Sequence, residues 1–316
     1  MPAQRTLGDG DRYCGKKLIR ECDHSCFRAA LALATKFALV GSTFILLAFP
    51  VASFAAPETT KAGESKLKSI QLCNGADRSS PDQQIKGCTA LIEAGKETGL
   101  ILAIAHTNRG NAYTAKGDYD LAISDYDTAV KLNPAFSKPF NSRGVAFFKK
   151  GDYERAIKDF DEAIKLQPDY AKAFANRAEA YQKRRDYQRA ARDYDEAIRL
   201  TPGVNAVWNG RCWARAILGQ LQPALADCNR ALTLRPNDAA TLDSRGLTYL
   251  KMGQFDSAID DYSSALRIEP NMASALYGRG LARLKKGDTT GGNADVAAAK
   301  RVEAKIDDDF SHYGIR

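Results

Sequence analysis

Few residues in this chain are suited to catalysis or metal binding. There are three histidines, His24, His106 and His312, and no two of them have the spacing of a metal site. The segment CDHSC at residues 22–26 contains candidate ligands, but such a site normally needs a second ligand pair. The sequence contains neither a phosphate-binding loop nor a nucleophile with an evident base. It therefore predicts a protein that is not an enzyme and that uses no cofactor and no metal.

Charged residues recur in two series with a period of 34 residues. The arginine series consists of Arg109, Arg143, Arg177, Arg211, Arg245 and Arg279. The aspartate series consists of Asp125, Asp159, Asp193, Asp227, Asp261 and Asp295. Since arginine can grip carboxylate or phosphate bidentately, the arginines could pair with the aspartates or bind an anionic ligand. Because each arginine has an acid in register, we predict a structural ladder of ion pairs. The sequence leaves open whether these pairs form within repeats or between them.

Prolines mark the same period. Pro134, Pro168, Pro202, Pro236 and Pro270 follow one another at intervals of 34 residues, which indicates an array of repeated units. Each unit contains two helical patterns of about 12 residues separated by a breaker. The breaker is usually glycine, which suits a helix end, and Arg185 replaces it in the third unit. An aspartate able to cap the second helix follows the breaker at Asp118, Asp152, Asp186 and Asp288. Each unit is therefore expected to be a helical hairpin.

Small and aromatic residues recur in the same frame. Alanine occupies positions 122, 156, 190, 224 and 258, and Tyr126, Phe160, Tyr194 and Tyr262 supply aromatic bulk. With these spacings the chain resembles the tetratricopeptide repeat over residues 103–306. The resemblance implies an all-α fold, a right-handed superhelical solenoid of antiparallel helical hairpins. Six repeats would be preceded by a degenerate hairpin and followed by a capping helix. Arginine at repeat position 7 and aspartate at position 23 resemble an arginine-rich, exported bacterial type.

An uncharged segment from Phe37 to Ala56 precedes the repeats and follows several basic residues. It resembles an export signal with a long leader, cleaved after Ala55. An uncleaved membrane anchor is the alternative, because about 20 apolar residues can span a bilayer, and a buried core helix is a third interpretation. Export or anchoring would place the repeats in the periplasm. The expected organisation is a leader at 1–55, a linker and degenerate hairpin at 56–102, six repeats at 103–306 and a polar C-terminal cap at 307–316.

Four of the seven cysteines follow the leader. The resemblance places Cys212 and Cys228 at positions 8 and 24, which face each other within one hairpin. Cys88 aligns with position 24 of the degenerate hairpin and follows Cys73 by 15 residues. Since exported proteins meet an oxidising environment, we predict two disulfides, Cys73–Cys88 and Cys212–Cys228. Four reduced cysteines buried in the core are the alternative.

In tetratricopeptide repeats the first helix of each hairpin lines a concave groove. Transferred residue by residue, the lining positions give a candidate peptide-binding groove: Asn111, Lys138, Asn141, Phe148, Lys149, Lys172, Lys183, Asn209, Trp213, Leu247, Leu250, Lys251, Tyr277, Leu281 and Lys285. The early half is polar and basic, and the later half is apolar and aromatic. This pattern predicts an extended peptide or a partner helix with apolar anchors and an acidic flank. Packing between helices is the alternative for some of the apolar residues.

These observations favour a non-enzymatic protein–protein interaction scaffold of the bacterial cell envelope. The alternative is an adaptor anchored in the inner membrane by its N-terminal segment, with the repeats in the periplasm. The net charge of +8 and the pI of 9.0 also raise nucleic-acid binding. Residues 1–55 carry seven basic and four acidic side chains, so the remainder would carry +5, since 8 − 7 + 4 = 5. This charge is dispersed along the chain. We therefore predict a protein or peptide partner and no nucleic acid.

Overall fold

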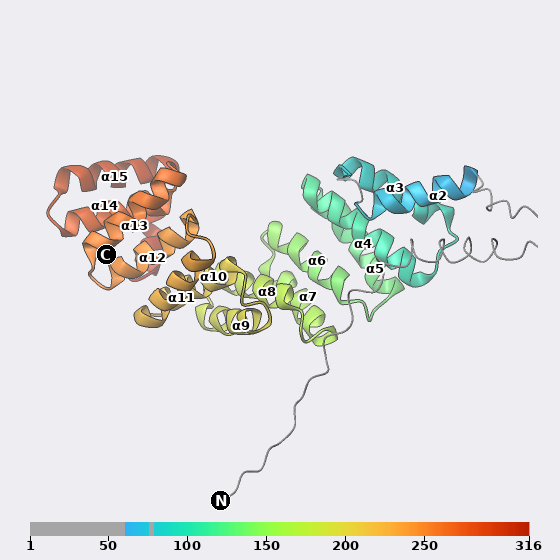
Figure 1. The fold of residues 1–316 in the computed structure, drawn as a ribbon, viewed down its shortest axis with the longest axis horizontal. Helices are drawn as coiled ribbons and strands as arrows, with labels where there is room; N and C mark the ends of the chain where they lie inside the picture. The colour runs from blue at the N-terminus through green and yellow to red at the C-terminus, as the bar shows by residue number, and fades with distance from the viewer. Residues whose placement is uncertain (1–60, 76–78, 316) are drawn as a thin grey trace, which may run out of the picture. The chain divides into compact units, whose positions relative to one another are not determined.

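The computed structural model describes residues 61–75 and 79–315, which all belong to one compact unit, Thr59–Arg316. The predicted export signal or anchor lies outside the described residues. Within these residues the secondary structure is helical and contains no strand (Figure 1). No helix in the same ranges combines the length and the apolar character needed to cross a bilayer.

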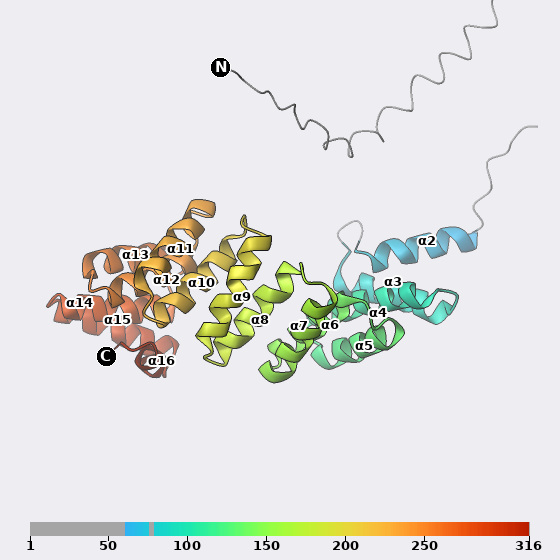
Figure 2. The ribbon, with the colours of Figure 1, turned by 90° about the horizontal axis from the view of Figure 1, so that it is seen from below.

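Antiparallel pairs of helices follow one another along the chain (Figures 1 and 2). The pairs are α2 (Lys61–Cys73) with α3 (Pro81–Ala94), α4 (Gly99–Lys116) with α5 (Tyr119–Leu132), α6 (Ser137–Lys149) with α7 (Tyr153–Leu166), α8 (Ala171–Lys183) with α9 (Tyr187–Leu200), α10 (Asn205–Ile217) with α11 (Leu221–Leu234), α12 (Ala239–Lys251) with α13 (Phe255–Ile268), and α14 (Ala273–Lys285) with α15 (Thr289–Val302). A short helix, α16 (Ile306–His312), comes last. The second helix of each pair packs against the first helix of the next. The predicted solenoid of helical hairpins is confirmed.

The turn inside each repeat hairpin depends on one residue with positive φ. Gly117, with φ of 85°, ends α4, and Gly151, with φ of 82°, serves the second repeat. Arg185 adopts the same left-handed conformation, with φ of 60°, where the third repeat lacks the glycine. A Cβ in this region costs about 1–2 kcal/mol. The turn between α8 and α9 therefore keeps its geometry at the expense of local strain.

Aspartates cap three of the four second helices that the sequence analysis singled out. Asp152, Asp186 and Asp288 each accept a hydrogen bond from the backbone amide three residues later. The prediction is wrong for Asp118, whose side chain makes no capping hydrogen bond. In the second and third repeats an arginine three residues later also bonds the carboxylate. Leu121 stands at that place in the first repeat and has no side-chain donor.

In the first, second and fifth repeats the two helices of the hairpin meet where a glycine faces a large ring. A Cβ added to Gly144 would lie 2.6 Å from an atom of the Phe160 ring, so this approach of α6 to α7 requires glycine. Gly110 stands against Tyr126 in the same way. Both rings are at most 1% exposed. Because each hairpin buries its apolar face only against its neighbours, the core runs along the stack instead of filling one centre.

Both predicted disulfides are present. Cys73–Cys88 joins α2 to α3, with the Cα atoms 4.5 Å apart, and Cys212–Cys228 joins α10 to α11, with the Cα atoms 5.4 Å apart. All four cysteines are at most 3% exposed. Each disulfide therefore closes one hairpin inside the core.

Candidate peptide-binding groove

The arginine and aspartate series form a ladder of bidentate ion pairs. In the third repeat, Arg177 donates from Nε to Asp193 Oδ2 over 2.7 Å and from Nη2 to Oδ1 over 2.8 Å. Its Nη1 donates to Asp161 Oδ1 of the preceding repeat over 2.5 Å. The bidentate pair within the hairpin recurs in all six repeats. The two series therefore pair within each hairpin, and a separate third bond of each arginine joins neighbouring hairpins.

The third bond of each arginine reaches the hairpin before it, through residues that the sequence analysis did not select. The acceptors, in chain order, are Thr89, Asp127, Asp161, Asp195, Asn229 and Ser263. From the second repeat onward, each acceptor stands two positions after an aspartate of the ladder. That fixed offset is the sequence signal that could have identified them.

Burial makes the ladder a structural element. The aspartates keep 4–10% of their side-chain surface exposed and the arginines 13–23%. Burial tends to raise the pKa of Asp125, but hydrogen bonds to Arg109 and His106 hold it below its usual value. The pKa of Arg177 is raised because its bonds to Asp193 and Asp161 outweigh burial. Three donor groups of each arginine are thus used inside the stack, which leaves little capacity for an external anion.

The predicted groove residues fall into three groups by exposure. The exposed ones are Asn111, Lys138, Lys149, Lys172, Lys183 and Lys285. Those of intermediate exposure are Phe148, Asn209, Trp213, Lys251, Tyr277 and Leu281. The buried ones are Asn141 at 8%, Leu247 at 4% and Leu250 at 7%. Asn141 accepts a hydrogen bond from Asn176 Nδ2 over 2.9 Å. The exposed groove is therefore richest in lysine, and its leucines at positions 247 and 250 belong to the core.

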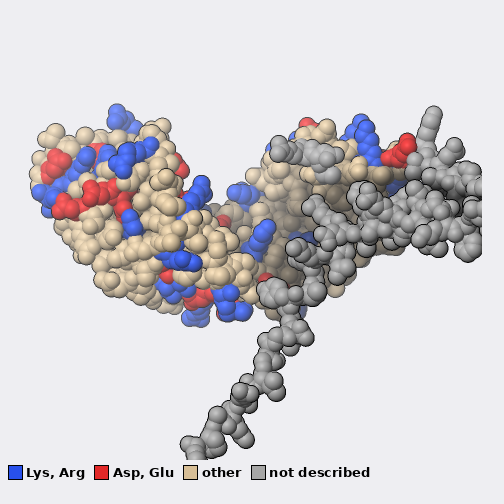
Figure 3. All heavy atoms as spheres, in the orientation of Figure 1, with Lys and Arg blue, Asp and Glu red and all other residues tan. Residues whose placement is uncertain are grey.

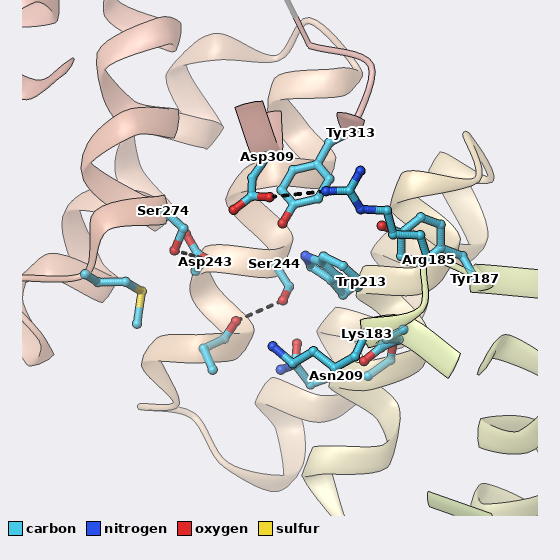
Figure 4. A pocket seen from close by; sticks show the side chains of 14 residues that line it. Lys183, Arg185, Tyr187, Asn209, Trp213, Asp243, Ser244, Ser274, Asp309 and Tyr313 are labelled. Atoms are coloured by element: carbon cyan, nitrogen blue, oxygen red, sulfur yellow. Dashed lines mark hydrogen bonds and ion pairs between the residues drawn. The ribbon is translucent and has the colours of Figure 1, made fainter. Parts of the chain in front are cut away.

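Two adjoining pockets form the open middle of the groove. The first, of about 380 Å³, reaches from Phe148 on α6 to Asn209 on α10. The second, of about 550 Å³, extends from α8 to α14 and ends at Tyr313 (Figure 4). Gln182, Lys183 and Asn209 line both. Lysine and arginine side chains gather around the hollowed surface over α8 and α10 (Figure 3). The two pockets share part of their lining and are continuous. Their charged lining is mixed: the basic residues are Lys183, Arg185 and Arg235, and the acidic ones are Glu179, Asp238, Asp243 and Asp309.

A buried carboxyl group lines the larger pocket. Burial raises the pKa of Asp243 to about 7, although Ser274 Oγ donates to its Oδ2 over 2.9 Å. Its Oδ1 and the Oδ1 of Asn209 are buried, and within the described part of the chain neither has a hydrogen-bond partner. Burial of this carboxyl group therefore favours its protonated form.

The hydroxyl group of Tyr262 is also without a partner among the described residues. In the first repeat the equivalent Tyr126 donates to Asn111 over 2.8 Å, and in the third Tyr194 donates to Gln182 over 3.1 Å. The fifth repeat has leucines at the corresponding groove positions, 247 and 250. Replacement of polar groove residues by leucine thus explains the isolated hydroxyl.

The apolar end of the groove is covered by the C-terminal segment of the chain. Phe310 of α16 lies 4.7 Å from Tyr277, measured between ring centroids, and Tyr313 lies 5.4 Å edge-on from Trp213 (Figure 4). Lys251 Nζ donates to the carbonyl oxygen of Tyr313 over 2.6 Å. Three predicted groove residues therefore contact the protein's own tail.

The C-terminal helix α16 is not the polar cap that the sequence analysis expected, because one of its faces is apolar and buried. Ile306 is 3% exposed and Phe310 is 2% exposed. Both belong to one hydrophobic cluster with Leu247, Leu250 and Leu281. The apolar face of α16 is difficult to recognise in the sequence, because three aspartates separate Ile306 from Phe310. At the 3.6-residue period of a helix they share one side.

The chain is a stack of helical hairpins, two of them closed by disulfides, with pockets along one side. This architecture defines a helical repeat protein. Comparison with family profiles specifies which kind: residues 103–136 match "Tetratricopeptide repeat", residues 175–239 match a second tetratricopeptide-repeat profile, and residues 144–184 and 246–287 match "TPR repeat". The chain belongs to the tetratricopeptide-repeat family. A search of curated proteins finds no match.

Solved structures share the fold at low sequence identity. A tetratricopeptide repeat protein from Parabacteroides merdae is 17% identical, with a TM-score of 0.60 over 79% of this chain and 99% of that chain. The Cut9–Hcn1 assembly of APC/C is 17% identical, with a TM-score of 0.59 over 76% of this chain and 44% of that chain. Pseudomonas aeruginosa pilF is 16% identical, with a TM-score of 0.55 over 64% of this chain and 92% of that chain. At these identities the likeness concerns the fold alone.

Proposed function

We propose that this protein is a non-enzymatic scaffold of the bacterial cell envelope that binds a protein or peptide partner in its groove. The observation that carries the proposal is the continuous groove from Phe148 to Tyr313, where Lys183 and Arg185 line the same pocket as the rings of Tyr187, Trp213 and Tyr313. Scaffolding by protein–protein contact is typical of the tetratricopeptide-repeat family. A peptide with apolar anchors and an acidic residue placed near Lys183 and Arg185 fits this lining, since these two cations attract its charge and the rings accept its apolar side chains.

The location in the envelope has its own support. Two buried disulfides suit a protein that matures in an oxidising compartment. The resemblance of residues 37–56 to an export signal points to the same compartment. The protein would be periplasmic after cleavage near Ala55, or held at the inner membrane by the uncleaved segment, with its repeats in the periplasm.

Site-specific photocrosslinking in living cells tests partner binding. A photoreactive amino acid replaces Lys183, which lines both pockets. The matched control carries it at Lys165, a lysine on α7 with 72% of its side chain exposed that lines neither pocket. We expect a discrete protein adduct from position 183 and none from position 165. Identical adducts from the two positions, or none from either, would contradict groove binding.

Intact mass spectrometry of the protein recovered from its native cell fraction tests the location. A periplasmic species that begins near Ala56 and gains four hydrogens on reduction is expected if export is followed by cleavage. A membrane-bound species of full length with the same gain fits the anchored form. A cytoplasmic full-length species with free thiols would refute the envelope assignment.

A further inference from the structure

The tail, defined as residues 303–315, occupies the apolar end of the groove as a separate ligand would. Ile315 packs against the same hydrophobic cluster, and three further apolar contacts come from side chains in or next to α16, namely Ile306, Phe310 and Tyr313. Their spacing is i, i+4 and i+7, the spacing by which an amphipathic helix anchors itself in a groove. The receiving surface is formed by α10, α12 and α14, through Trp213 and Tyr277 among others.

Charge reinforces this fit. Three consecutive aspartates, at positions 307, 308 and 309, stand between the first and second anchors. Asp309 lies 3.9 Å from Arg185, and Asp307 accepts a hydrogen bond from Lys300 over 2.7 Å. The groove contributes Lys183 and Lys251 nearby. The aspartates of the tail therefore lie near basic side chains, and its aromatic anchors lie against aromatic side chains of the groove.

Few polar bonds hold the tail. Lys251 donates to the backbone carbonyl of Tyr313, a bond that any peptide could accept because it involves no side chain of the tail. The pair Lys300–Asp307 is exposed on both sides, with 44% and 42% of the side chains accessible. The pair Arg185–Asp309 is long, with 51% and 41% of the side chains exposed, so it adds little. Helix α16 has seven residues and no side-chain cap, and helices of this length are unstable alone. The tail is thus held mainly by its apolar contacts with the groove.

The tail is also continuous with the open groove. Asp309 and Tyr313 line the larger pocket together with Lys183 and Asn209, which belong to its uncovered part (Figure 4). A partner bound over α8 and α10 would therefore reach the tail site by extending along one groove. Such a two-part contact can overcome the high local concentration of the tethered tail.

Resting on the function proposed above, we infer that the surface of α10, α12 and α14 is a docking site for an acidic partner segment with apolar anchors at i, i+4 and i+7. The second and third anchors of the partner are aromatic. Without the partner the tail occupies this site, and the partner displaces the tail. The segment KIDDDFSHYGIR, residues 305–316, defines the chemistry of the partner.

A labelled synthetic peptide with this sequence is the probe, and the full-length protein is the target. The double variant Phe310→Ala/Tyr313→Ala weakens the internal tail, and Lys305→Ala/Ser311→Ala is the matched control because both residues are exposed. We expect the weakened variant to bind the peptide at least tenfold more tightly than the wild type or the control. Adding Trp213→Ala should abolish this gain, and replacing the three aspartates of the peptide by asparagine should reduce binding severalfold.

Equal weak binding by all four proteins would overturn the inference, provided that circular dichroism shows unchanged helix content. If the weakened variant loses helicity, hydrogen exchange of the wild type decides. Saturating peptide must then accelerate exchange in α16, and unchanged protection would overturn the inference. A concentration-dependent dimer that disappears in the weakened variant would also overturn it, by assigning the site to a second copy of the chain. Crosslinking at Lys183 tests the proposed function separately, since it can succeed while the tail remains bound.

Discussion

Loss of one arginine from the ladder should destabilise the stack far more than loss of a surface charge. Arg177→Ala removes both bonds to Asp193 and the bond to Asp161. It leaves the carboxylate of Asp193, which is 9% exposed, without its cation. Breaking a buried pair on one side costs about 3–5 kcal/mol. Because the arginine keeps 18% exposure and water can enter, we expect the lower end, about 3 kcal/mol.

A double-mutant cycle separates the pair from its surroundings. Asp193→Ala alone should cost about 2–3 kcal/mol, since it strands a partly exposed guanidinium group that still contacts Asp161. The double variant should cost less than the sum of the single variants by about 1.5 kcal/mol or more, because it leaves no isolated charge in the core.

The assay is urea unfolding followed by circular dichroism without reductant, so that both disulfides remain closed. Arg192→Ala is the control, because this arginine is exposed on the same helix as Asp193; it should stay within about 0.5 kcal/mol of the wild type. Additive single costs, or a loss below about 1 kcal/mol for Arg177→Ala, would refute the buried-pair argument.

Three further changes test the packing inside a hairpin, the disulfide Cys212–Cys228 and the carboxyl group of Asp243 in the larger pocket. Gly144→Ala should cost about 1–3 kcal/mol in urea unfolding, because its Cβ would meet the Phe160 ring at 2.6 Å; an unchanged midpoint would show that the ring moves freely. Replacing Cys212 and Cys228 by serine should lower the unfolding free energy by about 3 kcal/mol, and reductant should then have less effect than on the wild type. The raised pKa of Asp243 means that the folded state retains its proton more firmly than the unfolded state, so this group's contribution to stability is complete below pH 4 and declines as pH rises toward about 7. Asp243→Asn should therefore flatten the pH dependence of the urea midpoint between about pH 4 and 7, and an unchanged profile would exclude this assignment.

The sequence was sufficient for the hairpins because their signals are local. Proline, glycine and alanine recur with the 34-residue period of the hairpin. The pairing Cys212–Cys228 follows once the two helices of that hairpin are taken to be antiparallel. The ladder was harder to predict, because a guanidinium group can bond to carboxylates on two sides at once. Only the stacking of hairpins shows that Arg177 reaches both Asp193 and Asp161.

The position of the tail depends on tertiary contacts that no local pattern contains. The spacing of Ile306, Phe310 and Tyr313 is visible in the sequence, but the surface that receives them comes from helices up to a hundred residues earlier. For the same reason, Leu247 and Leu250 looked like groove residues and are part of the core. The repeat frame is enough to predict which helix faces could line a groove, whereas the contacts of the tail with α10, α12 and α14 could not be predicted in this way.

The third bond of each ladder arginine has a mechanical consequence. Its acceptor is charged at the three central junctions, where it is Asp127, Asp161 or Asp195, and neutral at the outer ones. Charge-assisted bonds are roughly twice as strong as neutral ones, so the array should be stiff in its middle and compliant toward its ends. The open pockets begin on these rigid hairpins, while the tail lies on the compliant C-terminal ones. A partner would thus contact the stiff central hairpins first and the more compliant C-terminal hairpins second.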